Sequence, residues 1–152
     1  MARFRYRMQN ILNIKLKLED QEKQNFAMAR NRLTEEEEIL KGYQEKRDYI
    51  AREGVRMRTE KIDLLKIKEN TALASYYDDQ IRSQKVKVAT AQKNLETARK
   101  RMQNAITERK IHEKLRENAF EKFVKEEAMN EAKEIDELTS YKYGLKQKQS
   151  EV

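Results

Sequence analysis

The chain has 152 residues, of which 40% are charged, and it contains no proline, cysteine or tryptophan. Compact domains reverse direction at turns rich in glycine and proline, so three glycines in the whole chain exclude an ordinary globular fold. Disordered chains lack periodic apolar residues, whereas 38% of these residues are hydrophobic and recur at helical spacings. Basic residues number 34 and acidic residues 27, mixed as on a solvated helix surface. The predicted fold class is all-α, with few long elements.

Residues 1–18 carry five basic side chains and no acidic one. Apolar residues here recur at spacings of three and four, with Lys15 as a polar guest: Phe4, Met8, Ile11 and Leu18. This spacing predicts a helix that begins within the first few residues. The alternation Arg-Phe-Arg-Tyr-Arg over residues 3–7 leaves a short strand as an alternative.

From Phe26 the apolar stripe continues to Ile50, with Glu36 and Arg47 as polar guests, through Ala29, Leu33, Leu40 and Tyr43. Glu22 and Asn25 interrupt the register between the two stretches, and such slips locally unwind a supercoil. Gly54 is the only glycine near mid-chain, and glycine often marks a helix end. The first helix is therefore expected over residues 3–52.

A short connecting helix is expected over residues 57–68, within a tip spanning residues 53–70. Asn70 and Thr71, both good N-cap residues, then predict a second helix over residues 71–140 and a frayed tail over 141–152. The second helix has one stripe with Gln84 as its polar guest: Ile81, Val88, Ala91, Leu95, Ala98, Met102 and Ala105. It has another with Glu131 and Lys142 as guests: Val124, Ala128, Ile135, Leu138 and Leu145.

Stripes repeating every 3.5 residues on average are typical of coiled coils. The prediction is one coiled-coil domain over residues 1–152: a long two-helix antiparallel hairpin with a short connecting helix at its tip. A continuous helix that dimerises with a second molecule is the alternative.

Sequence motifs for catalysis and cofactors are absent. There is no glycine-rich phosphate loop, no His/Cys cluster for a metal, and the single histidine, His112, lies on an apolar stripe as a polar guest. A two-helix rod also lacks the concave, desolvated pocket that catalysis needs. We therefore expect no enzyme activity, no catalytic residue, no cofactor and no metal.

Basic and aromatic residues suggest binding surfaces instead. Nine Lys or Arg against two Glu in residues 81–110 either bind phosphate backbone or form a solvated helix face. The N-terminal arginines contact either a protein or an anionic membrane surface. Tyr43, Tyr49, Tyr76 and Tyr77 flank the expected reversal, where they either cap the apolar stripe or contact a partner.

No apolar run approaches the roughly 20 residues of a membrane span, and the amphipathic N-terminus is unlike a signal peptide. The absence of cysteine suits a reducing compartment. A soluble, intracellular protein is expected.

Four segments of the chain carry motifs that are informative together. The opening Phe4-Arg-Tyr-Arg-Met-Gln-Asn-Ile-Leu-Asn-Ile-Lys15 precedes an acidic Glu19-Asp-Gln-Glu22. Further on come Leu40 with Tyr43 to Tyr49 and then a glycine, the set Leu73, Tyr77, Ile81 and Gln84, and the acidic pair Asp136-Glu137. Together they resemble the flagellar FliJ family, in the opening segment, the end of the first helix, the start of the second and an acidic pair near the C-terminus. The resemblance covers nearly all of the chain.

The resemblance implies a component of the bacterial flagellar type III export apparatus, involved in flagellum biogenesis and hence motility and chemotaxis. It implies a fold similar to the central stalk of rotary ATPases, with both chain ends entering the hexameric ring of the export ATPase. The hairpin tip would contact the cytoplasmic domain of the export gate, and the protein would also handle export chaperones. It would be cytoplasmic, at the inner face of the membrane at the flagellar base, and bind no specific nucleic acid.

The residues expected at the ATPase-facing end are Arg3, Phe4, Arg5, Arg7, Ile11, Ile135 and Leu138. Those expected toward the gate-facing tip are Leu40, Tyr43, Tyr49, Leu73, Tyr77 and Ile81. Binding would stimulate ATP hydrolysis without chemistry by the rod itself. A nucleic-acid-binding coiled coil, a self-associating scaffold, and the equivalent stalk of a virulence secretion system are the alternatives.

Overall fold

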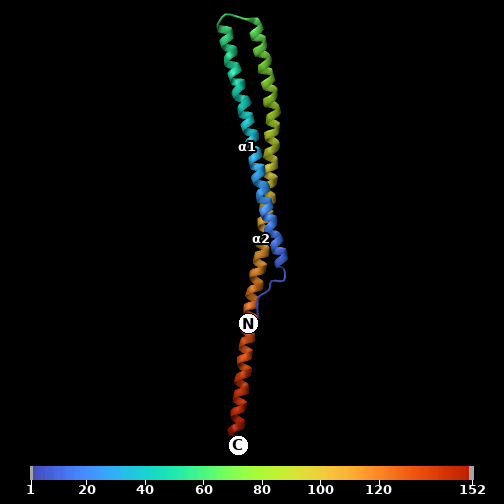
Figure 1. The fold of residues 1–152 in the computed structure, drawn as a ribbon, viewed down its shortest axis with the longest axis vertical. Helices are drawn as coiled ribbons and strands as arrows, with labels where there is room; N and C mark the ends of the chain where they lie inside the picture. The colour runs from blue at the N-terminus through green and yellow to red at the C-terminus, as the bar shows by residue number, and fades with distance from the viewer. Residues whose placement is uncertain (1, 151–152) are drawn as a thin grey trace. The chain divides into compact units, whose positions relative to one another are not determined.

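A computed structural model describes residues 2–150 of the chain. It contains two long helices, α1 (Gln9–Thr59) and α2 (Leu64–Ser150), and no strand among the described residues (Figure 1). The all-α class and the helical hairpin predicted from the sequence are confirmed. By its contacts the chain divides into unit 1, which is Met1–Leu18 with Ile106–Val152, and unit 2, which is Glu19–Ala105.

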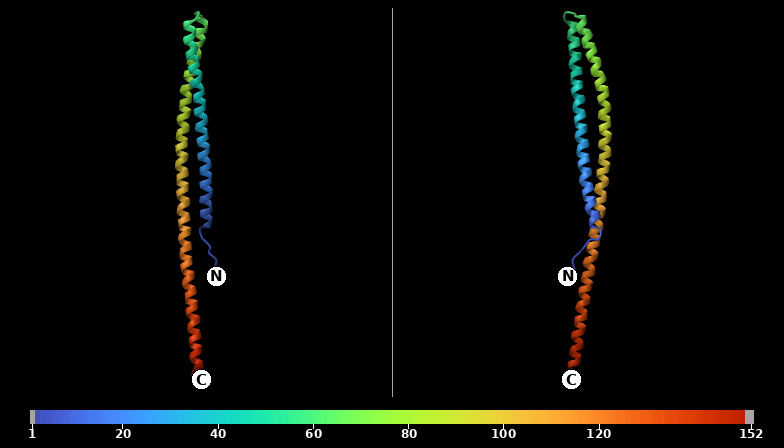
Figure 2. Two further views of the ribbon diagram at one scale, coloured as in Figure 1. Left: turned by 90° about the vertical axis from the view of Figure 1, so that its left-hand side faces the viewer. Right: turned by 45° about the vertical axis from the view of Figure 1, so that its right-hand side comes forward.

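Unit 2 is an antiparallel pair made by α1 and α2, which run side by side in every view (Figure 2). Along α2, every residue of the stripe predicted between Ile81 and Ala105 is buried or half-buried, including Gln84. Along α1, the predicted stripe from Phe26 to Ile50 faces inward in the same way. The repeat of apolar positions therefore determines which faces of the two helices meet.

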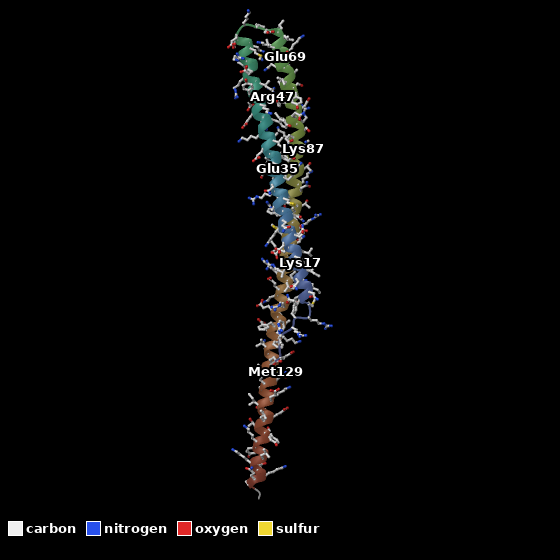
Figure 3. All side chains as sticks on the ribbon, viewed as in Figure 1. Lys17, Glu35, Arg47, Glu69, Lys87 and Met129 are labelled. Carbon is white, nitrogen blue, oxygen red and sulfur yellow. The ribbon has the colours of Figure 1, made fainter. Side chains whose placement is uncertain are left out.

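Polar contacts cross the helix pair of unit 2, and the one between Gln84 and Glu36 is buried. Gln84 and Glu36 are 3% and 4% exposed, and the Gln84 amide donates to the Glu36 backbone carbonyl (2.9 Å) and to its carboxylate. Arg32 pairs with the same carboxylate at 2.8 Å. Nearer the turn, Arg47, labelled in Figure 3, pairs with Asp78 at 2.7 Å. Because a one-residue slip would orphan these groups, the polar contacts specify the pairing register.

The chain reverses in four residues, 60–63, without glycine or proline. The Asp63 carboxylate accepts hydrogen bonds from the backbone amides of Leu65 (3.1 Å) and Lys66 (3.5 Å), so Asp63 is the N-cap of α2. The expected connecting helix over 57–68 is wrong: α1 continues to Thr59, and α2 begins at Leu64, directly after Asp63. Asn70 and Thr71, the expected caps, lie inside α2.

Gly54 lies inside α1 and does not end it. A Cβ built on Gly54 would lie 2.8 Å from Asn70 Oδ1, and the Asn70 amide donates to the Ile50 carbonyl at 3.0 Å. The glycine therefore allows close approach of the two helices, and the Asn70 contact replaces the capping role expected of that residue. This tertiary contact offsets the low helix propensity of glycine.

Unit 1 pairs the N-terminal residues with the second half of α2. Helix α1 begins at Gln9 and not at residue 3: residues 2–6 have no regular secondary structure, and there Phe4 and Tyr6 are half-buried whereas Arg3 and Arg5 are exposed. Between Gln9 and Glu19 the inward residues are Gln9, Leu12, Lys15 and Glu19. Met8, Ile11 and Leu18 are exposed, so the stripe predicted for this stretch is wrong. Lys15 pairs with Glu108 at 3.5 Å. Arg116 Nε donates a hydrogen bond to Gln9 Oε1, the oxygen of the Gln9 side-chain amide, at 2.9 Å.

Helix α2 continues to Ser150, past the expected end at residue 140. The frayed tail predicted over 141–152 is therefore wrong for residues 141–150, which are helical, and residues 151–152 lie outside the described part. The second stripe predicted on this helix, from Val124 to Leu145, is exposed. No other part of unit 1 runs beside the last turns of α2 in any view (Figures 1 and 2). The single-domain organisation stays a prediction.

We predict that Asp63→Ala lowers the free energy of unfolding by about 1 kcal/mol, because the first turn of α2 loses its capping carboxylate. Chemical denaturation followed by circular dichroism measures the change. Lys61→Ala, in the same turn, is the control and should shift the free energy by less than about 0.5 kcal/mol. Equal effects of the two substitutions would contradict the capping assignment.

We predict opposite effects for alanine at two glycines of α1. Gly42 has no atom within 4 Å of a built Cβ, so Gly42→Ala should raise the free energy of unfolding by up to about 1 kcal/mol through helix propensity. Gly54→Ala should lower it, because the new methyl displaces Asn70 and breaks its hydrogen bond to Ile50. The same denaturation experiment compares the two, and stabilisation by both would refute the close-approach role of Gly54.

Candidate functional site

The aromatic residues near the turn form a cluster within unit 2. The rings of Tyr43 and Tyr77 lie 6.3 Å apart and those of Tyr76 and Tyr77 5.2 Å apart. Lys46 Nζ lies 6.0 Å from the centre of the Tyr77 ring. Leu40 and Ile81, like Tyr43 and Tyr77, are half-buried. These four residues of the predicted tip set therefore belong to the packing between the helices.

Tyr49 and Leu73, the remaining two residues of the tip set, line a pocket at the turn. The pocket has a volume of about 470 Å³ and mixes apolar and charged side chains. Its lining includes Tyr49, Ile50, Glu53, Arg56, Met57, Glu60, Lys61, Asp63, Lys66, Glu69, Asn70 and Leu73. Tyr49 and Leu73 are 58% and 49% exposed. A partner can reach these two residues, whereas the other four are available only in part.

The Arg56 guanidinium organises the charged wall of this pocket. It bonds to the Glu53 carboxylate at 2.6 Å and to the Glu60 carboxylate at 3.1 Å. The hydrogen bond that Arg56 donates to the Glu53 carboxylate, followed by the negative charge of Glu53 and Glu60, raises the pKa of Arg56. The arginine remains a cation held in place between two acids at the end of α1.

The N-terminal segment is anchored in unit 1 by Phe4. Its ring lies 5.2 Å from that of Phe120 and 5.4 Å from that of Phe123, and the Arg116 guanidinium carbon lies 5.5 Å from the ring centre. Arg3, Arg5 and Arg7 are exposed, and no ion pair found among residues 2–150 includes them. Phe4 therefore positions this segment, while the three cations remain available to a partner.

The predicted ATPase-facing residues are not all brought together. Phe4 packs near Phe123, and Ile135 lies twelve residues further along α2, which corresponds to roughly 18 Å of helix. Ile135 and Leu138 are 63% and 59% exposed. Ile11 is 38% exposed, at the start of α1. The set thus forms a basic, aromatic-anchored part and a separate apolar part on α2.

Sequence reasoning missed Arg116, Phe120 and Phe123, which hold Phe4 in place. The signal was two phenylalanines three residues apart, with an arginine one turn before them. His112 was expected as a polar guest, and it lies half-buried on the inward side of α2. Its Nδ1, the Tyr6 hydroxyl and Glu22 Oε2 are buried and have no hydrogen-bond partner among the described residues.

The basic run over residues 81–110 is partly neutralised by ion pairs. Arg82 pairs with Asp79, Arg99 with Glu96, and Arg109 with Glu113. Lys85 and Lys87 are exposed. This run is a charged helix face with alternating partners rather than a continuous cationic groove.

Over the described residues, no group of three or more acidic or histidine side chains is arranged to hold a metal ion. No helix among the described residues has a stretch long and apolar enough to cross a bilayer.

Comparison with known proteins gives two matches. Residues 4–148 match the family described as flagellar FliJ protein. A solved structure described as that of a YscO homolog, CT670, from Chlamydia trachomatis is similar in fold, with a TM-score of 0.79 and 22% sequence identity. The similarity covers 96% of this chain and 99% of that one. A search of curated proteins finds no match.

The family match covers all of the predicted site residues except Arg3, and nearly all of both helices. It agrees with the resemblance found in the opening segment and in the acidic pair near the C-terminus. The chain therefore belongs to the flagellar FliJ protein family, a family of type III export components.

Proposed function

We propose that this chain is the non-enzymatic stalk of a type III export apparatus, which binds and stimulates the hexameric export ATPase and connects it to the export gate. The observation that carries the proposal is the exposed apolar face at Ile135 and Leu138 in a chain of this family. Large exposed apolar groups in a row mark interaction surfaces.

The ATPase-facing surface consists of Arg3, Arg5 and Arg7 together with Ile135 and Leu138. Within residues 2–150 no ion pair occupies the guanidinium groups of these arginines, and such groups suit carboxylates on a ring of subunits. The apolar pair supplies area that loses water on binding. Phe4 contributes indirectly, because its packing against Phe120 and Phe123 holds the arginines beside α2.

Stimulation of ATP hydrolysis follows from selective binding. A stalk that binds the assembled ring better than isolated ATPase subunits shifts the equilibrium toward the hexamer. It can do so without contributing a catalytic group, and we assign no cofactor to it.

The gate-facing surface is the pocket at the turn, where Tyr49 and Leu73 are exposed. Tyrosine is enriched among residues that dominate binding energy. The four residues packed between the helices, Leu40, Tyr43, Tyr77 and Ile81, support this surface. The proposed partners also include export chaperones. The proposed location is the inner face of the membrane near the flagellar base.

We predict that the purified chain increases ATP hydrolysis by its cognate export ATPase, and that Ile135→Asp with Leu138→Asp reduces the apparent affinity at least roughly tenfold, because two charges enter the contact. Phosphate release against chain concentration gives the measurement. Val86→Asp, at an apolar position 64% exposed in unit 2, is the matched control. No stimulation and no binding by the unmodified chain would refute the ATPase assignment.

For the gate, we predict that Tyr49→Ala with Leu73→Ala weakens binding of the cytoplasmic gate domain by roughly tenfold, as expected for loss of interfacial hot spots. Isothermal titration calorimetry measures the affinity. The Ile135→Asp, Leu138→Asp variant should bind the gate domain normally, because its changes lie in unit 1. Loss of gate binding in that variant, with retention in the turn variant, would reverse the assignment of the two surfaces.

A further inference from the structure

The last turns of α2 have an apolar face that nothing in the described structure covers. From residue 128 to residue 150 every residue except Gly144 is exposed. Ile135, Leu138 and Leu145 are 63%, 59% and 43% exposed, and they follow one another at spacings of three and seven residues. Long helices in proteins owe most of their stability to packing of such a face, so this segment is built to have a partner helix.

The charges of this segment divide into two halves. Residues 126–137 contain six acidic side chains and one lysine, whereas residues 139–150 contain three lysines and no acidic side chain. A parallel pair of two such segments would place like charges together. An antiparallel pair places the acidic half of each segment beside the basic half of the other.

The stripe is also complementary to itself when reversed. Placing Ile135 opposite Leu138 of a second copy brings Glu131 opposite Lys142 and Ala128 opposite Leu145. The two polar guests of the stripe are thus an acid and a base that face each other, once on each side of the two-fold axis. Between Ala128 and Leu145 every apolar residue of the stripe meets an apolar residue, and at the outer end Val124 lies opposite Gln149. Antiparallel coiled coils pack in this way, layer against layer.

We propose that the C-terminal segment of α2, residues 124–149, is a self-association surface that pairs antiparallel with the same segment of a second copy. The Glu131–Lys142 layers specify its register. The dimer covers Ile135 and Leu138, which the proposed function assigns to the ATPase. Self-association and ring binding therefore exclude each other, and the free chain has a form in which its apolar face is covered.

Analytical ultracentrifugation of the full chain over a range from low to high micromolar concentration tests the proposal without any ATPase. A reversible monomer–dimer equilibrium is expected. Glu131→Lys alone, or Lys142→Glu alone, should raise the dimer dissociation constant at least roughly tenfold, because each places like charges opposite each other in two layers. The double variant Glu131→Lys, Lys142→Glu should restore the original constant to within about threefold.

Glu126→Lys is the matched control, since it makes the same charge change at a position that points away from the stripe, and it should leave the constant unchanged. A chain that stays monomeric at all concentrations would overturn the proposal. So would equal effects of Glu126→Lys and Glu131→Lys, or a double variant that is no better than either single one.

Spin labels test the orientation, since the chain has no cysteine of its own. With Ser140→Cys or Gln147→Cys, an antiparallel dimer places the two labelled residues roughly 10 Å and roughly 30 Å apart along the helix axis. A parallel dimer gives short distances at both sites and would refute the proposal. Because these measurements use the chain alone, their failure is distinguishable from failure of the ATPase assignment.

Discussion

The structure depends on the pairing of α1 with α2 along a stripe that is only partly apolar. In unit 2 the contact that constrains this pairing most is the one between Gln84 and Glu36. Both side chains are almost fully buried, and the Gln84 amide donates hydrogen bonds to the backbone carbonyl and the carboxylate of Glu36. Apolar layers alone would allow two helices to slide by a heptad at small cost. A buried amide that must find one carbonyl and one carboxylate makes every other register leave polar groups unpaired.

Several further contacts between the two helices are polar, and most of them are at least partly exposed. Arg47 with Asp78, Asn70 with the Ile50 carbonyl, Lys15 with Glu108, and Gln9 with Arg116 all join α1 to α2 within one or the other unit. Only Leu12, Ile50 and Ala91 are buried apolar residues among those described. Specificity of pairing, more than depth of burial, distinguishes this hairpin, and it leaves the apolar surface at the end of α2 for association.

Periodicity predicted the parts of the fold that obey a repeat. The stripes from Phe26 to Ile50 and from Ile81 to Ala105 face inward as expected, because the two helices pair there. The predicted helix ends failed where a tertiary contact outweighs local preference. Gly54 lies inside α1 and does not end it, because Asn70 packs in the space beside the glycine. Asp63 caps the start of α2, although Asn70 and Thr71 are also good capping residues. The partner-binding role of the site residues stays a prediction. The sequence analysis did not predict that Phe4 packs on Phe120 and Phe123, because that contact joins residues far apart in the sequence.

The short turn at residues 60–63 has a consequence for how the chain is made. Ile50 and Asn70 are 20 residues apart in sequence, whereas Gln9 and Arg116 are 107 apart. Loop closure is cheapest for the nearest pair, so zippering starts at the turn and moves outward. During synthesis from the N-terminus, the first residues to leave the ribosome are the last to find their partners. The start of α1 therefore stays without its helical partner until the ribosome has made α2 as far as Arg116.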